Sequence, residues 1–582
     1  MRQMVFMHVC LLHLLLTEFT SVQTLHLSHN LLSMKPFILL LIVLVLSGNL
    51  FSQKTTSVAS TVARPKLVVG IVIDQMRWDY LYRYNDLFKT TGGFKRLLGQ
   101  GFSCENTFIP YTPTVTAAGH SCVYTGSVPA IHGIVGNNWY DNLQGKVVYC
   151  TDDDSVQTVG SNTTAGKMSP RNMLTTTIGD ELRLATNFKS KAIGIAIKDR
   201  GAILPAGHAA TSAYWYDYKT GDFITSTYYM NALPSWVMAF NARKITDSLY
   251  KLNWDTYLPK DVYTKYATAD DKPYENKPLG KDKSVFPYDL SGFIGKDYGK
   301  IASTPYGNSL TEAMAEATVK AENLGKNGVT DLLAVSFSSP DYIGHSFGPN
   351  SWEQLDDYVR LDETLGNFFA FLDATVGKGQ YTVFLTADHG VAHVPNFSIE
   401  NKLPGGAFDD GKVVNEMNAA LKPIFGSNKL IAGIFNYQVV FDNRIIDSLK
   451  LDKEKIYSWV INYLGQQKEI AQAFKTGNIM QAPITATQKQ MMVNGYYPPR
   501  CGDVQFVLKP GYVEGNGNGT SHGLWNPYDS HIPLLWYGWG IRQGRVYDQS
   551  SMTDIAATLA NLLHIQIPNA CIGKCIPGVL KN

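Results

Sequence analysis

The sequence predicts an α/β fold with a mainly parallel central sheet, flanked by helices and carrying cap insertions. Three apolar runs rich in Val, Leu, Ile and Phe lie at 67–73, 332–339 and 381–387. Runs of this length and composition are typical of strands buried on both faces of a sheet. Segments with helical spacing separate them, and strands that alternate with helices favour a parallel arrangement.

Each expected element follows from its residue pattern, because continuous apolar runs indicate strands and a 3.6-residue period indicates helices. In chain order, the expected strands are 67–73, 191–197, 331–338, 381–386, 503–508 and 533–537. The expected helices are 79–99, 114–126, 309–324, 352–376 and 553–563. All of these elements belong to one expected catalytic domain at 66–582.

Two stretches interrupt the alternation. Residues from about 214 to 306 are rich in Tyr, Trp, Lys and Asp and lack strong apolar periodicity. Residues from about 429 to 497 contain a strand-like run, LIAGIFNYQVVF, followed by one or two helices. Long segments without the core pattern are commonly functional insertions. We therefore interpret both stretches as insertions over the main sheet.

The N-terminus has the pattern of a signal peptide at 34–52. Lys35 precedes an apolar core at 37–46, and small and polar residues follow up to Ser52. The core is shorter than the roughly 20 residues that span a bilayer, so we expect cleavage after Ser52 and a periplasmic or secreted protein without stable membrane insertion. An uncleaved anchor is the alternative. Residues 1–33 are interpreted as an upstream extension.

Composition excludes some functions. The chain has 582 residues, a net charge of +2 and no run of Lys or Arg, so we expect no nucleic-acid partner. Six cysteines remain after loss of Cys10 with the leader. An even number in an exported chain permits disulfides. Cys571 and Cys575 are the best candidate pair, although the sequence does not determine the pairing.

Aspartates follow three of the predicted strands. Asp74, Asp341 and Asp388 come after the first, third and fourth strands, and ligands of open α/β sheets bind beyond the carboxyl ends of strands. Three carboxylates gathered there would repel one another unless a cation neutralised them. His345 lies one helical turn after Asp341, and His389 is adjacent to Asp388. Mixed oxygen and imidazole ligands suit Zn²⁺ better than Mg²⁺ or Ca²⁺.

A hydroxyl group lies close to this expected site. The segment PTVTAAGH at 113–120 places Thr114 and Thr116 where a helix is expected to begin. A helix N-terminus favours bound phosphate, although an isolated threonine there more often serves only as a cap. A threonine becomes a useful nucleophile when a base or a metal deprotonates it, and a pair of metal ions supplies that function.

Seven segments of the chain, in this order, carry a resemblance to a known family: VVGIVIDQMRWD, PTVTAAGH, GNNWYD, KDR, SSPDYIGH, TADHG and SHG. Together they resemble the alkaline phosphatase superfamily. The resemblance is strongest to its PafA-type alkaline phosphatases, which are exported and specific for monoesters. The similarity extends from about residue 66 to the C-terminal helix. The chain also resembles the type I phosphodiesterase/nucleotide pyrophosphatase branch of the superfamily. The resemblance implies two Zn²⁺ ions. One set of ligands would be Asp341, His345 and His522, and the other Asp74, Asp388, His389 and Thr116.

The resemblance also implies the reaction and the phosphate-binding residues. Thr116, the second hydroxyl of P-T-x-T, would form a phosphothreonine intermediate in a two-step phosphoryl transfer. Asn137 would donate to one phosphoryl oxygen, with Asn138 as the competing residue, and Lys198 and Arg200 would hold the others. The basic pair is spaced i, i+2, so both side chains would point the same way in an extended segment. A solvated strand end is the alternative for this pair.

Other motifs and functions are less well supported. The segment 519–523 fits the serine-hydrolase pattern G-x-S-x-G, but loop residues on both sides favour His522 as a ligand and Ser521 as a bystander. The segment 160–167 lacks the spacing of a P-loop, and no C/S-x-P-x-R segment of a sulfatase is present. A nucleotide pyrophosphatase/phosphodiesterase with the same metal site is the main alternative, and a non-catalytic metal-binding protein is another. We expect a monomer that takes phosphate monoesters.

Overall fold

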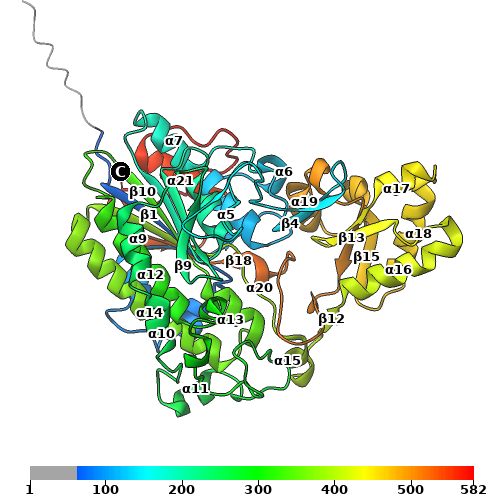
Figure 1. Ribbon diagram of the computed structural model, residues 1–582, viewed down its shortest axis with the longest axis horizontal. Helices are drawn as coiled ribbons and strands as arrows, with labels where there is room; N and C mark the ends of the chain where they lie inside the picture. Colours follow the sequence, from blue (N-terminus) through cyan, green and yellow to red (C-terminus); the bar gives the residue numbers. More distant parts are fainter. Residues whose placement is uncertain (1–61, 582) are drawn as a thin grey trace, which may run out of the picture. The chain divides into compact units, whose positions relative to one another are not determined.

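A ten-stranded sheet forms the centre of the computed structural model, which describes residues 62–581 (Figure 1). In spatial order its strands are β20 (Gly544–Val546), β2 (Phe102–Cys104), β19 (Leu534–Gly538), β11 (Tyr381–Thr386), β1 (Leu67–Ile73), β10 (Asp331–Phe337), β7 (Ala192–Ala196), β8 (Ser212–Asp217), β9 (Asp222–Ser226) and β6 (Thr158–Val159). The five strands from β11 to β8 are parallel, and β19 and β9 join them antiparallel. The predicted mainly parallel α/β fold is confirmed.

Helices cover both faces of this sheet (Figure 1). One group comprises α5 (Thr116–Thr125), α7 (Ile178–Ala185), α8 (Asp199–Ala206) and α21 (Asp554–Leu563). The other comprises α4 (Gly93–Gln100), α12 (Tyr306–Ala321) and α14 (Trp352–Leu372). Because both faces are covered, every residue of β1, β10, β7 and β11 is buried. This double burial explains why these strands read as continuous apolar runs rather than alternating ones.

The register of the parallel strands brings their carboxyl ends to one edge. Ile73 of β1 pairs with Phe337 of β10, and Val72 pairs with Thr386, the last residue of β11. Ser336 of β10 pairs with Ala196, the last residue of β7. Residues that follow these four strands therefore emerge beside one another. The sheet edge that they define carries the candidate site.

A second, smaller layer has its own apolar core. Its antiparallel sheet has the order β13 (Ile431–Phe435), β14 (Gln438–Phe441), β16 (Val504–Leu508) and β15 (Ile470–Lys475). Helices α16 (Asp410–Phe425) and α18 (Lys453–Gly465) pack on it (Figure 1, yellow to orange). Leu421, Val460 and Phe506 are among the residues buried between helices and sheet. This layer contains the second predicted insertion.

Two boundaries from the sequence need correction. The predicted strand at 503–508 belongs to the small sheet rather than to the main one, and α16 lies in the same layer outside the predicted 429–497. The first insertion was expected to begin near 214, but β8 and β9 extend the main sheet. Their Tyr, Trp and Phe side chains are buried on both faces, so the strands lack the alternating pattern that marks a half-buried strand.

The predicted upstream extension at 1–33 and signal peptide at 34–52 lie outside the described residues. Among the residues that the structure does describe, no helix has both the length and the apolar character needed to cross a bilayer. The six cysteines of this part of the chain are free thiols, so the predicted pair of Cys571 and Cys575 is not bonded here.

Candidate metal centre

Three buried aspartates meet at the carboxyl edge of the main sheet. Asp74 follows β1 directly, Asp388 follows β11, and Asp341 lies in the first turn of α13 (Ser339–Phe347), which follows β10. Their exposed fractions are 0%, 0% and 4%. Burial, followed by repulsion from Asp341 and Asp388, raises the pKa of Asp74 well above its ordinary value. The sheet edge thus brings carboxylates together in a place where water does not solvate their charge.

One donor set combines α13 with a distant loop. His345 follows Asp341 by one turn of α13, and its Nε2 lies 3.2 Å from Asp341 Oδ1. The loop before α20 (Pro527–Ser530) contributes His522, whose Nε2 lies 3.6 Å from the same oxygen. These three residues form one of two groups with the spacing of metal ligands among the described residues. The structure brings together the three residues predicted for the first metal.

The second donor set contains two carboxylate oxygens without hydrogen-bond partners. Asp74 Oδ1 and Asp388 Oδ2 each lie 3.5 Å from His389 Nε2, and both oxygens are buried and unpartnered. Asp341 is close enough to join Asp74 and His389 in the second metal-ligand group, so it borders both sets. Buried, unpaired carboxylate oxygens beside an imidazole fit a bound cation.

The three imidazoles are oriented alike. Nδ1 of His345 lies 2.7 Å from the carbonyl oxygen of Thr520, and Nδ1 of His522 lies 2.7 Å from that of Thr114. His389 contacts the carbonyl of the following glycine in the same way, at 2.9 Å. A carbonyl only accepts, so each Nδ1 donates to it, and Nε2 is the ring nitrogen that remains for a cation. This backbone support is typical of histidines that ligate metals.

The predicted nucleophile lies at the start of a helix. Thr116 is the first residue of α5, and its Oγ1 lies 3.5 Å from His389 Nε2. Gly119, one turn later, packs so closely on Asp388 that a Cβ there would collide with the main-chain oxygen of Asp388. The helix and the strand end that carries the ligands are therefore in direct contact. Thr114, the alternative hydroxyl, instead donates to the carbonyl of Leu524 at 3.0 Å.

Sequence reasoning missed the role of His120. Its Nδ1 lies 2.9 Å from the carbonyl oxygen of Thr116 and 3.3 Å from Asp388 Oδ2. Its Nε2 lies 2.8 Å from the Ser336 hydroxyl on β10. His120 thus connects the nucleophile helix, a candidate ligand and the central sheet. Its position one helical turn after Thr116 was the available signal.

Lys198 lies inside the cluster of carboxylates. Its Nζ is 2.6 Å from both Asp74 Oδ2 and Asp341 Oδ2. Burial opposes the charge, but the Asp341 and Asp74 carboxylates outweigh it and raise the pKa of Lys198. The lysine was predicted to contact phosphate, whereas here its contacts are the carboxylates of both donor sets. Its ammonium group supplies positive charge at the same place where a metal would.

Arg200 does not lie in an extended segment. It is in the first turn of α8, and its Nη1 donates to the Tyr149 hydroxyl at 2.9 Å. The predicted i, i+2 alignment with Lys198 is therefore wrong, because Lys198 precedes the helix and Arg200 lies within it. The buried Arg200 Nε has no partner. The guanidinium thus keeps a donor available, although from a helix rather than a strand.

One contact distinguishes Asn137 from Asn138 as the predicted phosphate-binding asparagine. Asn137 Oδ1 accepts a hydrogen bond from the backbone N–H of Ala117, next to Thr116, at 2.9 Å. Asn138 is exposed and begins β4 (Asn138–Asp141). The contact fixes the Asn137 amide beside the predicted nucleophile with its NH₂ group available, which favours Asn137 over Asn138. Ser521 lies in a loop rather than in a strand–turn–helix elbow, as expected.

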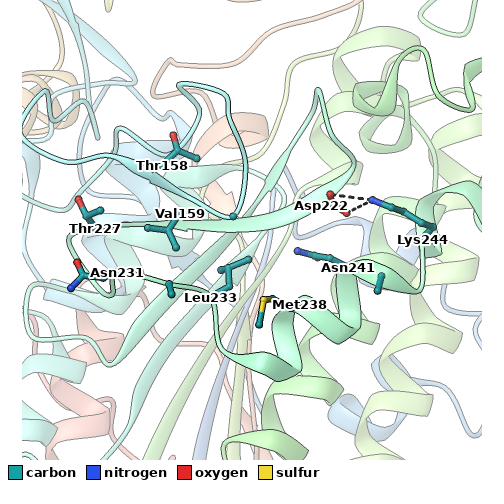
Figure 2. A pocket seen from close by; sticks show the side chains of 12 residues that line it. Thr158, Val159, Asp222, Thr227, Asn231, Leu233, Met238, Asn241 and Lys244 are labelled. Carbon is teal, nitrogen blue, oxygen red and sulfur yellow. Dashed lines mark hydrogen bonds and ion pairs between the residues drawn. The ribbon is translucent and has the colours of Figure 1, made fainter.

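The metal centre is separate from a surface cavity at the far edge of the sheet. Figure 2 shows this cavity, of about 560 Å³, lined by residues of β6, β9 and α9 (Ser235–Ala242). Asp222 and Lys244 form an ion pair of 2.8 Å at one side of it. None of the candidate metal ligands lines the cavity. The candidate active site is therefore the region around the two ligand sets and Thr116, and this cavity is not part of it.

The chain is similar to a known protein family, to curated relatives and to solved structures. Residues 68–529 match the family described as type I phosphodiesterase/nucleotide pyrophosphatase. The alkaline phosphatase PhoV of Synechococcus elongatus is 52% identical over 90% of this chain and 94% of its own length. A crystal structure of wild-type alkaline phosphatase PafA superposes with a TM-score of 0.87 at 47% identity, covering 89% of this chain and all of that one.

A further solved structure is of a PafA variant with four substitutions, in which a threonine is replaced by serine and an asparagine, a lysine and an arginine by alanine. It is 46% identical to this chain, with a TM-score of 0.87, and covers 89% of this chain and all of the other.

We expect Gly119→Ala to reduce metal retention and turnover by about 10- to 100-fold, because the added methyl group displaces Asp388 or the helix that carries Thr116. Bound metal per chain and kcat/KM for a phosphate monoester check this. Gly99→Ala is the matched control, since a Cβ at Gly99 meets no atom within 4 Å. Equal metal content in both variants would contradict the close contact with Asp388.

We expect removal of metal with a chelator to lower Tm by several degrees, because ligand binding to the folded state stabilises it and the buried carboxylates lose their counter-charge. Adding Zn²⁺ back should restore both Tm and turnover. Differential scanning calorimetry of the metal-free and reloaded protein measures this. Asp388→Asn should show a smaller recovery, and an unchanged Tm throughout would argue against a metal centre.

Proposed function

Because the chain belongs to the type I phosphodiesterase/nucleotide pyrophosphatase family, we propose that it is an exported alkaline phosphatase that uses two Zn²⁺ ions and a phosphothreonine intermediate. Its similarity to PhoV and PafA over about nine-tenths of the chain makes it a phosphomonoester hydrolase. The observation that carries the mechanism is the position of Thr116 Oγ1 beside His389, at the border of two ligand sets. Export rests on the expected signal peptide at 34–52.

The donor atoms suit zinc. Asp341, His345 and His522 would hold one ion, and the other would be held by Asp74, Asp388, His389 and Thr116. Four-coordinate nitrogen and oxygen sets are typical of this ion. When bound, the two ions supply Lewis acidity that makes the threonine hydroxyl acidic and stabilises negative charge on the phosphoryl and leaving oxygens.

The position of Thr116 supports its role as the nucleophile. It begins α5, where unpaired backbone N–H groups favour an anionic phosphoryl group. Its hydroxyl loses a proton to solvent, and Oγ1 forms a bond to phosphorus as the bond from phosphorus to the ester oxygen breaks. The departing alkoxide takes up a proton from solvent and leaves as the alcohol. Water then attacks the phosphothreonine, which releases inorganic phosphate and restores the hydroxyl. His120 holds the first turn of the helix during both steps through the Thr116 carbonyl.

Three side chains would bind the transferred group. Asn137 is fixed by its bond from Ala117 and keeps its NH₂ group free to donate. The substituted threonine and asparagine of the PafA variant are separated in the chain as Thr116 and Asn137 are, and its lysine and arginine as Lys198 and Arg200 are. This correspondence supports all four as members of one site. For Lys198, binding of phosphate would compete with its present contacts to Asp74 and Asp341.

The family description also names phosphodiesterases, so substrate class needs a physical argument. A monoester dianion carries one more negative charge on its phosphoryl group than a diester does, whereas a diester brings a second organic group. Two cationic side chains, Lys198 and Arg200, favour the dianion because charge-assisted hydrogen bonds are stronger than neutral ones. A nucleotide pyrophosphatase/phosphodiesterase with the same metals remains the second candidate.

We expect Thr116→Ala to abolish phosphomonoesterase turnover while both metals stay bound, and Thr116→Ser to retain part of it, because serine preserves the nucleophilic oxygen. Kinetics with p-nitrophenyl phosphate and metal analysis of the same samples check this. Mass spectrometry of acid-quenched Thr116→Ser and wild-type enzyme should detect one added phosphoryl group. Full turnover by Thr116→Ala would exclude threonine as the nucleophile.

We expect Arg200→Ala to lower kcat/KM for p-nitrophenyl phosphate by about 100-fold and for the bis ester by much less, because the lost donor serves the second charge. The exposed Arg444→Ala variant is the control and should match wild type with both substrates. A wild-type enzyme that prefers the bis ester would overturn the monoesterase assignment in favour of the phosphodiesterase.

A further inference from the structure

Gln75 contacts a carboxylate of each donor set. It follows Asp74 at the end of β1 and is fully buried. Its side-chain Nε2 donates to Asp341 Oδ1 at 2.7 Å, the oxygen that also lies nearest His345 and His522. Its backbone N–H donates to Asp388 Oδ1 at 3.1 Å. The other oxygen, Asp388 Oδ2, lies 3.5 Å from His389 Nε2 and 3.3 Å from His120 Nδ1.

The conformation of Gln75 is unfavourable by itself. Its φ of 67° lies in the left-handed region, which a residue with a side chain rarely adopts. Its amide oxygen, Oε1, is buried without a hydrogen-bond partner. A strained backbone and an unsatisfied buried polar atom both oppose folding, and such features are retained chiefly at functional sites. Its two contacts with ligands are the compensation that the structure offers.

The helix that carries two ligands makes room for this amide. Gly344 lies between Asp341 and His345 in α13, and a Cβ there would overlap Gln75 Oε1. Apart from Gln75, the nearest residue to that Cβ position is Gln354, whose Oε1 lies at 3.5 Å. Glycine at this position therefore allows the Gln75 side chain to reach Asp341 across the surface of α13. The two residues form a matched pair.

We propose that Gln75 is a positioning residue that orients Asp341 through its side chain and Asp388 through its backbone, and so fixes the two donor sets relative to each other. The inference rests on the proposed two-metal function. The side chain acts on the set of Asp341, His345 and His522. The backbone N–H acts on the set that contains Asp388, and substitution of the side chain leaves it in place.

Gln75→Gly tests the side chain alone, because glycine keeps the N–H and adopts a positive φ without strain. We expect one of the two metals to bind about 10- to 100-fold more weakly, with a matching fall in kcat/KM. Loss of a residue that hydrogen-bonds to a metal ligand typically weakens metal binding by this factor. Graded chelator competition, with metal content measured at each step, resolves the two affinities.

Asn187→Gly is the control for relieving a positive φ, since Asn187 has a φ of 51° on the surface far from the site. Gly344→Ala provides a second route, and we expect it to displace the Gln75 amide and weaken the same metal. In the Gln75→Gly background, Gly344→Ala should add no further loss, because the colliding group is absent. Additive losses in the double variant would overturn the pairing.

Two results would overturn the positioning role itself: wild-type affinity for both metals in Gln75→Gly, or an equal weakening of both. Either result leaves the proposed function standing if wild type still binds two metals and hydrolyses monoesters. A wild-type protein that binds no metal would instead refute the proposed function, before any variant is compared.

Discussion

Burial of like charges is the constraint on which the rest of this structure depends. Asp74, Asp341 and Asp388 are almost wholly removed from water at one sheet edge, where carboxylates repel one another strongly. Lys198 neutralises part of this charge, and three imidazoles turn Nε2 toward the centre while Nδ1 contacts a backbone carbonyl. Such an arrangement is stable only around positive charge. The fold therefore needs positive charge at this edge, whatever reaction takes place there.

The sheet produces this concentration of charge through register. β1, β10 and β11 are neighbours and end level with one another, so the residues that follow them share one small volume. Parallel strands need helical crossovers between them, and these crossovers bring α5 and α13 to the same edge. Thr116 and His345 enter the site in this way. Topology thus gathers residues that lie far apart in the sequence.

Sequence reasoning could identify the strands that end at the site because their burial on both faces leaves continuous apolar runs. It placed Asp341 and His345 on one helical face, which α13 confirms. It failed for β8, where buried aromatic residues mix with a polar composition, and for Arg200, whose helix begins at Asp199, shortly after the strand ends at Ala196. Gln75 escaped notice because its importance comes from a backbone torsion angle and a neighbouring glycine, which residue type does not reveal.

The small layer has a dynamic consequence for the metal centre. Tyr437, between β13 and β14, donates to the carbonyl of His522 at 3.0 Å, and a Cβ at Gly523 would crowd its ring. The loop that supplies one histidine ligand therefore rests on a layer with a separate apolar core. Regions with their own cores open independently of the rest of a protein. Opening of this layer would therefore release the loop that carries His522, although the layer itself contributes none of the candidate ligands.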